Sequence, residues 1–596
     1  MGNDEKYDLL PTVWNTVNAA RTIKTEGETA MEKFRDIPYA RPNLKQLKKE
    51  CAHYLQKLKN AASFGEADEA FLGFEATVER LMTRYTVASV RNTMDMSDSF
   101  YDGEMEFFNR ETPKLMLLVK RVNRALLQSA FRAQLTEKYG EKLFRDMEAQ
   151  QRLVSWKVIL PSVRENKLST AYSKTVAACS VDFRGEKCNF YGLLRHMQST
   201  DRTERKAAFE EWAKLYEGVS DKLDEQYGKL VEVRKKIAKR MGFSSYVEYN
   251  YLANGHYDYD AKEIASFREA VRTYITPLCE KLFREQAKRL GVEPMAWYDE
   301  GLCFADGNAT PNGTPEELTE KARQMYEEMS PETGEFFNFM VEHELLDLVT
   351  RENKHLGGYC TSLPVYKAPF IFSNFNGTSA DIDVLTHEAG HAFQNYYASR
   401  RLPISDLTGS TSDINEIHSM TMEFFAYPYM ERFFGENADK YRYAHFTESL
   451  KTIPYLVSVD EFQHRVFAEA SSTPADWRRI WRETERKYMP WRAYDDNAFL
   501  SGGGFWMQKQ HIFLYPFYYV DYALAQLDAF ALFQKQTEGK DAWGDYLKLC
   551  GMGGTYGYRE TLRRAGLPCP LDADFVRDIA TFAEQYAESL KQKVKA

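Results

Sequence analysis

The chain has 596 residues, of which 44% are hydrophobic and 28% are charged, enough for a substantial core beneath a charged surface. Its formal net charge of −9 and its lack of a basic cluster argue against nucleic acid as a partner. No apolar run has the length of a signal peptide or a membrane span, so we expect no membrane association. The eight cysteines include no CxxC pair, which indicates reduced thiols and predicts a cytoplasmic protein.

The first part of the chain divides into a polar start, a helical region and a possible sheet. Residues 1–36 are weakly patterned and predict an N-terminal extension. Residues 44–150 contain long amphipathic runs with a helical period. Residues 151–190 contain apolar positions that predict strands, namely Val154, Trp156, Val158, Leu160, Val176, Val181 and Phe183. Residues 200–290 return to a helical pattern.

Two shorter segments precede the clearest motif of the chain. Residues 343–347 (HELLD) imitate a metal-binding pattern with Asp347 in place of a second histidine, but we interpret them as an amphipathic helix. Residues 369–372 (PFIF) break the helical pattern and predict an extended edge strand. Such an edge either pairs with a peptide backbone by strand addition or belongs to an ordinary short hairpin.

The clearest motif is HEAGH at residues 387–391. Residues 378–381 (TSAD) fit a capping box, and the apolar residues after them recur at a helical period, which predicts a helix ending before Pro403. On that helix His387 and His391 lie one turn apart on the same face and can offer two imidazole nitrogens to one zinc ion. Glu388 occupies the general-base position of metalloproteases. The alternative is a buried helix that carries two histidines by chance.

A catalytic zinc site usually needs a third protein ligand. The metzincin subclass is excluded, because Gln394 and Tyr397 stand where it would need Gly and His. Residues 410–413 (STSD) form another capping box, and Glu416 in the first turn of the helix they open is a candidate ligand. Glu423, two turns further on the same face, could orient a histidine. Glu416 could instead only complement the helix dipole. The rival ligands are Asp406, Asp413 and His418.

A group of tyrosines near residue 520 could supply hydrogen-bond donors. Tyr515, Tyr519 and Tyr522 are four and three residues apart, which places them on one helical face if Pro516 lies in the first turn. A phenol there can donate to an oxyanion without carrying charge. On spacing alone, an aromatic core is the preferred interpretation, because the chain has 37 tyrosines.

Residues 357–378, HEAGHAFQ at 387–394 and EIHS at 416–419 together resemble the catalytic segment of oligoendopeptidase F-type zinc metallopeptidases, which are relatives of thimet oligopeptidase and neurolysin. The resemblance implies a mainly α-helical, two-lobed fold with a deep central channel and a small β-hairpin or sheet beside the HExxH helix. It also implies that Glu416 is the third ligand. We expect an N-terminal helical lobe over residues 37–200 and a catalytic zinc-peptidase domain over residues 201–596.

The activity implied by the resemblance is cleavage of internal peptide bonds in short oligopeptides with one Zn²⁺ ion. His387, His391 and Glu416 would bind the ion, and Glu388 would take the proton of the attacking water and pass it to the leaving amine. The oxyanion would be stabilised by Tyr519, Tyr522 and His511, although His511 stands one residue closer to the first tyrosine than in the thimet branch. The alternatives are a metallocarboxypeptidase of the same architecture and a catalytically silent peptide-binding relative. The intact Glu388 argues against the silent relative.

Overall fold

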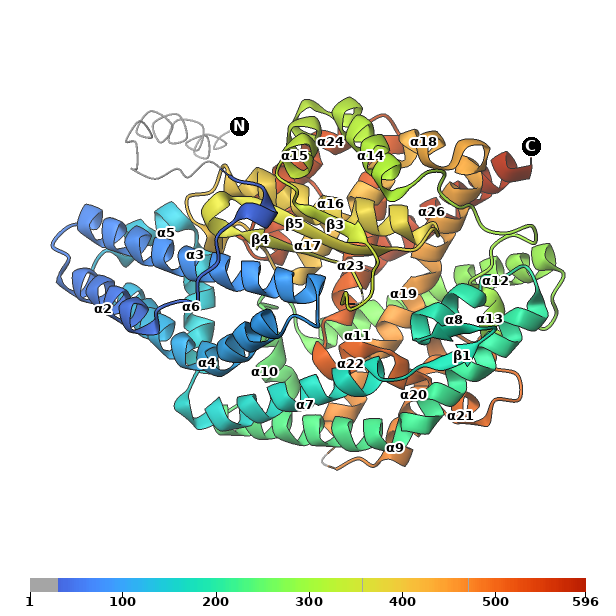
Figure 1. Cartoon of the computed structure of the whole chain (residues 1–596), viewed down its shortest axis with the longest axis horizontal. Coiled ribbons are helices and arrows are strands. Elements are labelled where there is room, and N and C mark those ends of the chain that lie inside the picture. The colour runs from blue at the N-terminus through green and yellow to red at the C-terminus, as the bar shows by residue number, and fades with distance from the viewer. Residues whose placement is uncertain (1–30, 356, 470, 596) are drawn as a thin grey trace, which may run out of the picture.

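The protein is represented by a computed structural model that describes residues 31–355, 357–469 and 471–595 (Figure 1). Helices make up most of this part of the chain, with two small sheets between them, which confirms the predicted mainly α-helical class. Among the described helices, none is both long enough and apolar enough to cross a membrane.

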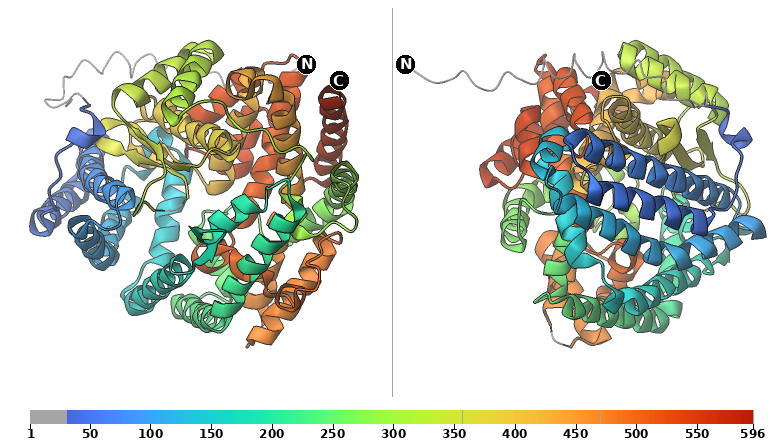
Figure 2. Two further views of the ribbon diagram at one scale, coloured as in Figure 1. Left: turned by 45° about the vertical axis from the view of Figure 1, so that its right-hand side comes forward. Right: turned by 90° about the vertical axis from the view of Figure 1, so that its left-hand side faces the viewer.

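Five helices form an N-terminal layer: α2 (Leu44–Asn60), α3 (Phe64–Met94), α4 (Ser99–Leu127), α5 (Arg132–Tyr139) and α6 (Glu141–Leu153). Asn43 begins α2 by accepting hydrogen bonds from the backbone amides of Lys45 and Gln46, each at 3.1 Å. The helices α2, α3 and α4 pack against one another, as the right-hand view of Figure 2 shows. Their buried cluster, which includes Phe71 and Leu135, is completed by residues that follow the HEAGH motif, namely Ala398, Leu402, Ile404 and Leu407.

The rest of the chain surrounds the motif with helices and contains one large core. The elements before the motif are α7 (Ile159–Ala177), β1 (Val181–Phe183), β2 (Glu186–Cys188), α8 (Phe190–His196), α9 (Arg202–Met241), α10 (Tyr246–Ala253), α11 (Ala261–Ala270), α12 (Thr276–Leu290), α13 (Trp297–Glu300), α14 (Pro315–Met329) and α15 (Pro331–Glu342). The helices from the motif onward are α16 (Ala380–Ser399), α17 (Ser412–Phe425), α18 (Glu431–Phe434), α19 (Ala438–Ala468), α20 (Pro474–Tyr488), α21 (Ala498–Ser501), α22 (Gln510–Leu514), α23 (Tyr519–Thr537), α24 (Ala542–Met552), α25 (Tyr558–Ala565) and α26 (Ala573–Lys595).

A three-stranded sheet lies against α16 and is formed by β3 (Leu346–Val349), β4 (Tyr359–Leu363) and β5 (Ala368–Phe375). The strand order is β3-β5-β4, with β3 parallel and β4 antiparallel to β5. The prediction that residues 369–372 form an edge strand is therefore wrong. They belong to the central strand, whose backbone groups already pair on both sides, and β4 and β3 are the edges.

Two other predicted elements differ from the structure. Within residues 151–190, Trp156–Val158 form a 3₁₀ turn and α7 follows, so only the short hairpin of β1 and β2 is extended. Trp156 and Leu160 are 76% and 79% exposed, so the apolar alternation there does not mark a buried sheet face. Residues 343–347 are not a continuous helix, because α15 ends at Glu342 and Leu346 begins β3.

The predicted division of the chain begins with an N-terminal extension. Most of the expected extension over residues 1–36 lies outside the described residues. Among the last residues of this predicted extension, Phe34 is 3% exposed, and its ring lies 4.4 Å from the ring of Phe370 on β5. The boundary between lobes at residues 200 and 201 stays a prediction.

Candidate metal centre and active site

The HEAGH motif lies on α16, whose start is fixed by a carboxylate. Asp381 accepts hydrogen bonds from the backbone amides of Asn376 at 2.9 Å and Gly377 at 2.8 Å. The capping box predicted for residues 378–381 is wrong, because the Thr378 hydroxyl donates to Oδ1 of Asn376 at 2.8 Å instead of capping the helix, and the N-cap residue, Ser379, makes no side-chain cap. Asp381 nevertheless links residues 376 and 377 to the first turn of α16. Its negative charge also complements the helix dipole at that end.

Three side chains that were predicted as metal ligands converge from two helices. The Nε2 atoms of His387 and His391 lie 3.3 Å and 3.4 Å from Oε2 of Glu416 on α17. The two imidazoles and one carboxylate form a group that could hold a metal ion, and nitrogen and oxygen donors of this kind suit zinc. Glu416 is 3% exposed. Burial alone would raise the pKa of its carboxyl, but the neighbouring His391 and His387 hold that pKa well below the usual value.

A glycine in the motif allows α16 and α17 to approach closely. A Cβ atom on Gly390 would lie 2.6 Å from the carbonyl oxygen of His418 and 2.6 Å from Cα of Ser419. These are backbone atoms of α17, one turn after Glu416, so they cannot move aside as a flexible side chain would. The absence of a side chain at Gly390 thus lets the carboxylate come within ligand distance of the histidines.

A chain of hydrogen bonds holds His387 from behind. Its Nδ1 donates to Oε1 of Glu423 at 2.6 Å, which is the contact expected of a residue that orients a histidine. The other oxygen of Glu423 lies 2.8 Å from Nε2 of His445, and Nδ1 of His445 lies 2.7 Å from the hydroxyl of Tyr427. His445 and Tyr427 were not predicted from the sequence. Because the ring is fixed through Nδ1, its Nε2 atom is left facing the other candidate ligands.

Two further side chains hold Glu416 and were also missed. The Tyr518 hydroxyl donates to Oε1 of Glu416 at 2.6 Å, and the Ser419 hydroxyl donates to Oε2 at 2.9 Å. Ser419 lies three residues after the glutamate on the same helix, so its position could have been inferred from helical spacing. Tyr518 comes from the segment between α22 and α23, and no local pattern in the sequence indicates that contact.

Glu388 lies on the same helix as both histidines and is 7% exposed. Burial raises the pKa of its carboxyl, while the neighbouring His387 and His391 act in the opposite direction. Its carboxylate approaches Gly358, the residue immediately before β4, because a Cβ atom on Gly358 would lie 3.5 Å from Oε1 of Glu388, and α16 packs against β4. The edge strand of the sheet and the predicted base therefore lie next to each other.

The predicted oxyanion donors gather on one wall of a cavity of about 530 Å³, to which His511, Tyr519 and Tyr522 all contribute. The ring of His511 lies 4.8 Å from that of Tyr519, and the rings of Tyr519 and Tyr522 are 5.7 Å apart. Burial and the nearby Lys509 lower the pKa of His511 to about 3, so its imidazole is neutral at neutral pH. Tyr515 does not belong to this wall: α23 begins only at Tyr519, and Tyr515 is 56% exposed.

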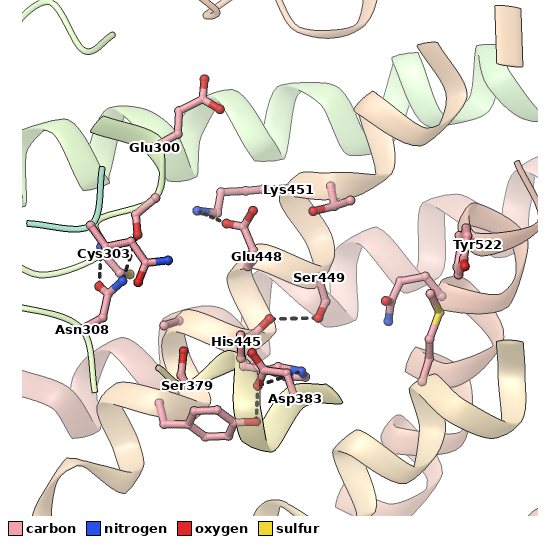
Figure 3. Close-up of a pocket in the computed structure, with 18 of the residues that line it drawn as sticks. Glu300, Cys303, Asn308, Ser379, Asp383, His445, Glu448, Ser449, Lys451 and Tyr522 are labelled. Carbon is pink, nitrogen blue, oxygen red and sulfur yellow. Dashed lines mark hydrogen bonds and ion pairs between the residues drawn. The ribbon is translucent and has the colours of Figure 1, made fainter. Parts of the chain in front are cut away.

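The cavity extends from this wall toward α19, as Figure 3 shows. Asp383, one turn before His387 on α16, accepts a hydrogen bond from Tyr441 at 2.6 Å. The lining there includes Lys451, which lies 2.9 Å from Glu448, and Glu300, which pairs with Arg492 at 2.6 Å. Charged and neutral polar side chains therefore both line this cavity.

None of the three rival ligands belongs to the group formed by His387, His391 and Glu416. Asp413 belongs to a separate buried cluster with His256 and Asp521 and accepts a hydrogen bond from Tyr259 at 2.8 Å. His418 is 1% exposed, and its burial lowers its pKa to about 3. Asp406 lies in the 3₁₀ turn Ser405–Leu407, before α17 begins.

Two protein-family models match this chain. A model of the peptidase M3 N-terminal domain matches residues 34–154, and a model of peptidase family M3 matches residues 195–581. The chain belongs to peptidase family M3. The solved structure of PZ peptidase A with an inhibitor superposes on this M3 peptidase with a TM-score of 0.90 and 42% sequence identity, over 94% of this chain and 99% of that one.

More distant relatives are oligopeptidases by name. Oligopeptidase PepF of Bacillus subtilis is 22% identical over 96% of this M3 peptidase and 88% of the relative. An oligoendopeptidase F homolog of Mycoplasma genitalium is also 22% identical, over 62% of this chain, and the match spans 63% of that protein. The family assignment makes this chain a peptidase.

Proposed function

We propose that this M3 peptidase is a zinc-dependent endopeptidase that hydrolyses internal bonds of oligopeptides. The observation that carries the proposal is the convergence of His387, His391 and Glu416, with Glu388 beside them, in a chain of this family. Their nitrogen and oxygen donors suit zinc. Glu423 holds His387 and Tyr518 holds Glu416 by hydrogen bonds. The names of the relatives support oligopeptides as the substrate class.

Each group near the cluster has a place in this reaction. A zinc ion held there would act as a Lewis acid and supply a nucleophilic water at neutral pH. Glu388 would accept a proton from the attacking water and deliver it to the leaving amine. Tyr519, Tyr522 and the neutral His511 would donate hydrogen bonds to the oxyanion that develops on the substrate carbonyl. We also propose that the substrate backbone aligns along β4, the edge strand beside Glu388, and not along residues 369–372.

A cytoplasmic location is part of the same proposal. All eight cysteines are free, and most of them are buried. Free thiols of this kind are typical of a reducing compartment. In that compartment, a peptidase that cleaves short peptides would act on the products of protein turnover.

The decisive experiment compares the wild-type protein with Glu388→Gln on an internally quenched peptide of about ten residues that is blocked at both termini. Zinc content is measured on the same samples, and Glu436→Gln, a change at an exposed position, serves as the matched control. We expect wild type and the control to cleave inside the peptide, and Glu388→Gln to retain zinc but lose cleavage. Trimming of only those peptides that have a free C-terminus would favour a carboxypeptidase. Zinc binding without any cleavage would favour a silent peptide-binding protein.

A further inference from the structure

A second group of metal-ligating side chains lies far from the candidate active site in the sequence. Glu186 and Cys188 come from β2, and His196 is the last residue of α8. Their potential ligand atoms all lie within 4.8 Å of one another. A thiol, an imidazole and a carboxylate in this proximity form a donor set that suits zinc and other borderline-soft divalent ions.

The histidine of this group is already oriented as a metal ligand would be. Its Nδ1 atom lies 2.7 Å from Oε1 of Glu204 on α9, and the other oxygen of Glu204 accepts a hydrogen bond from Ser199 at 2.9 Å. Since Nδ1 donates to the carboxylate, Nε2 carries the free lone pair. A carboxylate on the non-ligating nitrogen is the usual arrangement for a histidine bound to zinc.

The free nitrogen has no ordinary partner among the described residues. Nε2 of His196 is buried and makes no hydrogen bond, and the nearest carboxylate oxygen, on Glu186, is 3.9 Å away. A buried polar atom without a partner costs free energy, so such atoms are rare in native proteins. If Cys188 were only a core residue and Glu186 only part of a surface ion pair, Nε2 of His196 would stay without a partner. A cation bound between the three side chains would give this nitrogen a partner.

The other two ligands have complementary surroundings. Cys188 is 3% exposed, and a Cβ atom on Gly192 would lie 3.3 Å from its sulfur, so the first turn of α8 closes over the thiol. The Glu186 side chain is 58% exposed and pairs with Arg195 on the solvent side. The group is thus covered on the protein side and open on the solvent side, which gives an ion a route of entry.

We propose that Cys188, His196 and Glu186 form a second metal site that takes zinc or a similar divalent ion, with solvent in the fourth position. Binding releases the thiol proton to solvent, and the thiolate and carboxylate together neutralise the charge of the ion. The ion fastens the β1–β2 hairpin to α8 and, through Glu204, to the first turn of α9. This site is independent of the proposed peptidase chemistry.

Cobalt distinguishes the two sites, because a cobalt–thiolate bond gives a near-ultraviolet charge-transfer absorption and the HEAGH cluster offers no thiolate. Metal is removed with a chelator, and the full-length protein is reloaded with Co²⁺. We expect the absorption in wild type together with about two cobalt ions per chain, falling to about one in Cys188→Ser with the absorption lost. Peptide cleavage should be unchanged in that variant. A His387→Ala, Glu416→Ala double variant should keep the absorption and lose cleavage.

Cys360→Ser is the matched control, because Cys360 on β4 is close enough to Glu388 to interact with its charge. Absence of the band from wild type, or its loss in Cys360→Ser but not in Cys188→Ser, would overturn the proposal. If Cys188→Ser fails to fold, maleimide labelling of the wild-type protein tests the second site instead. Zinc should slow maleimide labelling of Cys188 by about tenfold or more without slowing that of Cys279, which is also buried. Equal slowing of both thiols would contradict the second site.

Discussion

The close approach of α16 and α17 makes Gly390→Ala the most informative single substitution in this protein. An added methyl group would lie 2.6 Å from backbone atoms of α17, whereas ordinary contact begins at 3.4 Å. The two helices would therefore have to separate by about 0.8 Å, since neither contact atom belongs to a flexible side chain. Metal sites tolerate ligand displacements of only about 0.2 Å. The substitution thus separates Glu416 from the two histidines without changing any ligand.

Two opposing effects set the size of the change. Replacing glycine by alanine inside a helix normally stabilises it by about 1 kcal/mol. Overpacking a close contact costs about 1–3 kcal/mol, and a backbone contact lies at the upper end of that range. We expect a net destabilisation of about 2 kcal/mol and a loss of metal affinity of about 10- to 100-fold, as for disturbed ligand supports in other sites.

The assay is thermal unfolding with and without metal, combined with competition against a chelator for the bound ion. Gly218→Ala is the matched control, because Gly218 also lies inside a helix, α9, but has open space where the methyl group would go. The control should be as stable as wild type or slightly more stable, with unchanged metal affinity. Wild-type stability and affinity in Gly390→Ala would refute the reasoning from the close approach.

Two further predictions concern side chains that hold the site or lie behind it. Tyr518→Phe removes one hydrogen bond from Glu416 and should weaken metal binding by about 10-fold or more in chelator competition. The control Tyr515→Phe should leave the metal affinity unchanged. Equal affinities in the two variants would exclude a role of Tyr518 in supporting Glu416. Asp528 is fully buried, both of its carboxylate oxygens lack hydrogen-bond partners, and burial followed by the nearby Asp413 raises its pKa well above the usual value. The folded state therefore binds the proton more tightly than the unfolded state, so this stabilisation is complete below about pH 4 and is lost as the pH rises toward the raised pKa. Asp528→Asn should increase Tm at pH 8 and change it little at pH 4, and a gain that is larger at pH 4 would contradict this assignment.

Much of the candidate site could be predicted because its elements obey local rules. The helix that carries His387 and His391 follows from a 3.6-residue period, and a four-residue spacing places the two rings on one face. Glu416 could be proposed as a candidate on a second helix, and the family resemblance singled it out, although it lies in the second turn of α17 and not in the first as predicted. The seven-residue spacing to Glu423 similarly predicted a residue that orients a histidine, and in the structure Glu423 accepts a hydrogen bond from His387.

The parts that could not be predicted depend on contacts between distant segments. Residues 346–349 form a strand because they pair with residues 371–375, and no local period shows such a partner. The same pairing makes residues 369–372 a central strand when composition alone suggested an edge. Tyr518 reaches Glu416 across about a hundred positions of the sequence, and His445 reaches Glu423 from another helix. Tertiary packing decides all of these placements.

The buried cluster under the N-terminal layer has a consequence for synthesis on the ribosome. The helices that end at Leu153 present Phe71 and Leu135 to a core that is completed only by Ala398–Leu407. At about 5–20 residues per second, that completing segment is made on the order of tens of seconds after the layer itself. During this interval the nascent layer has an uncovered apolar face. The first quarter of this peptidase should therefore benefit from a chaperone while the chain is being made.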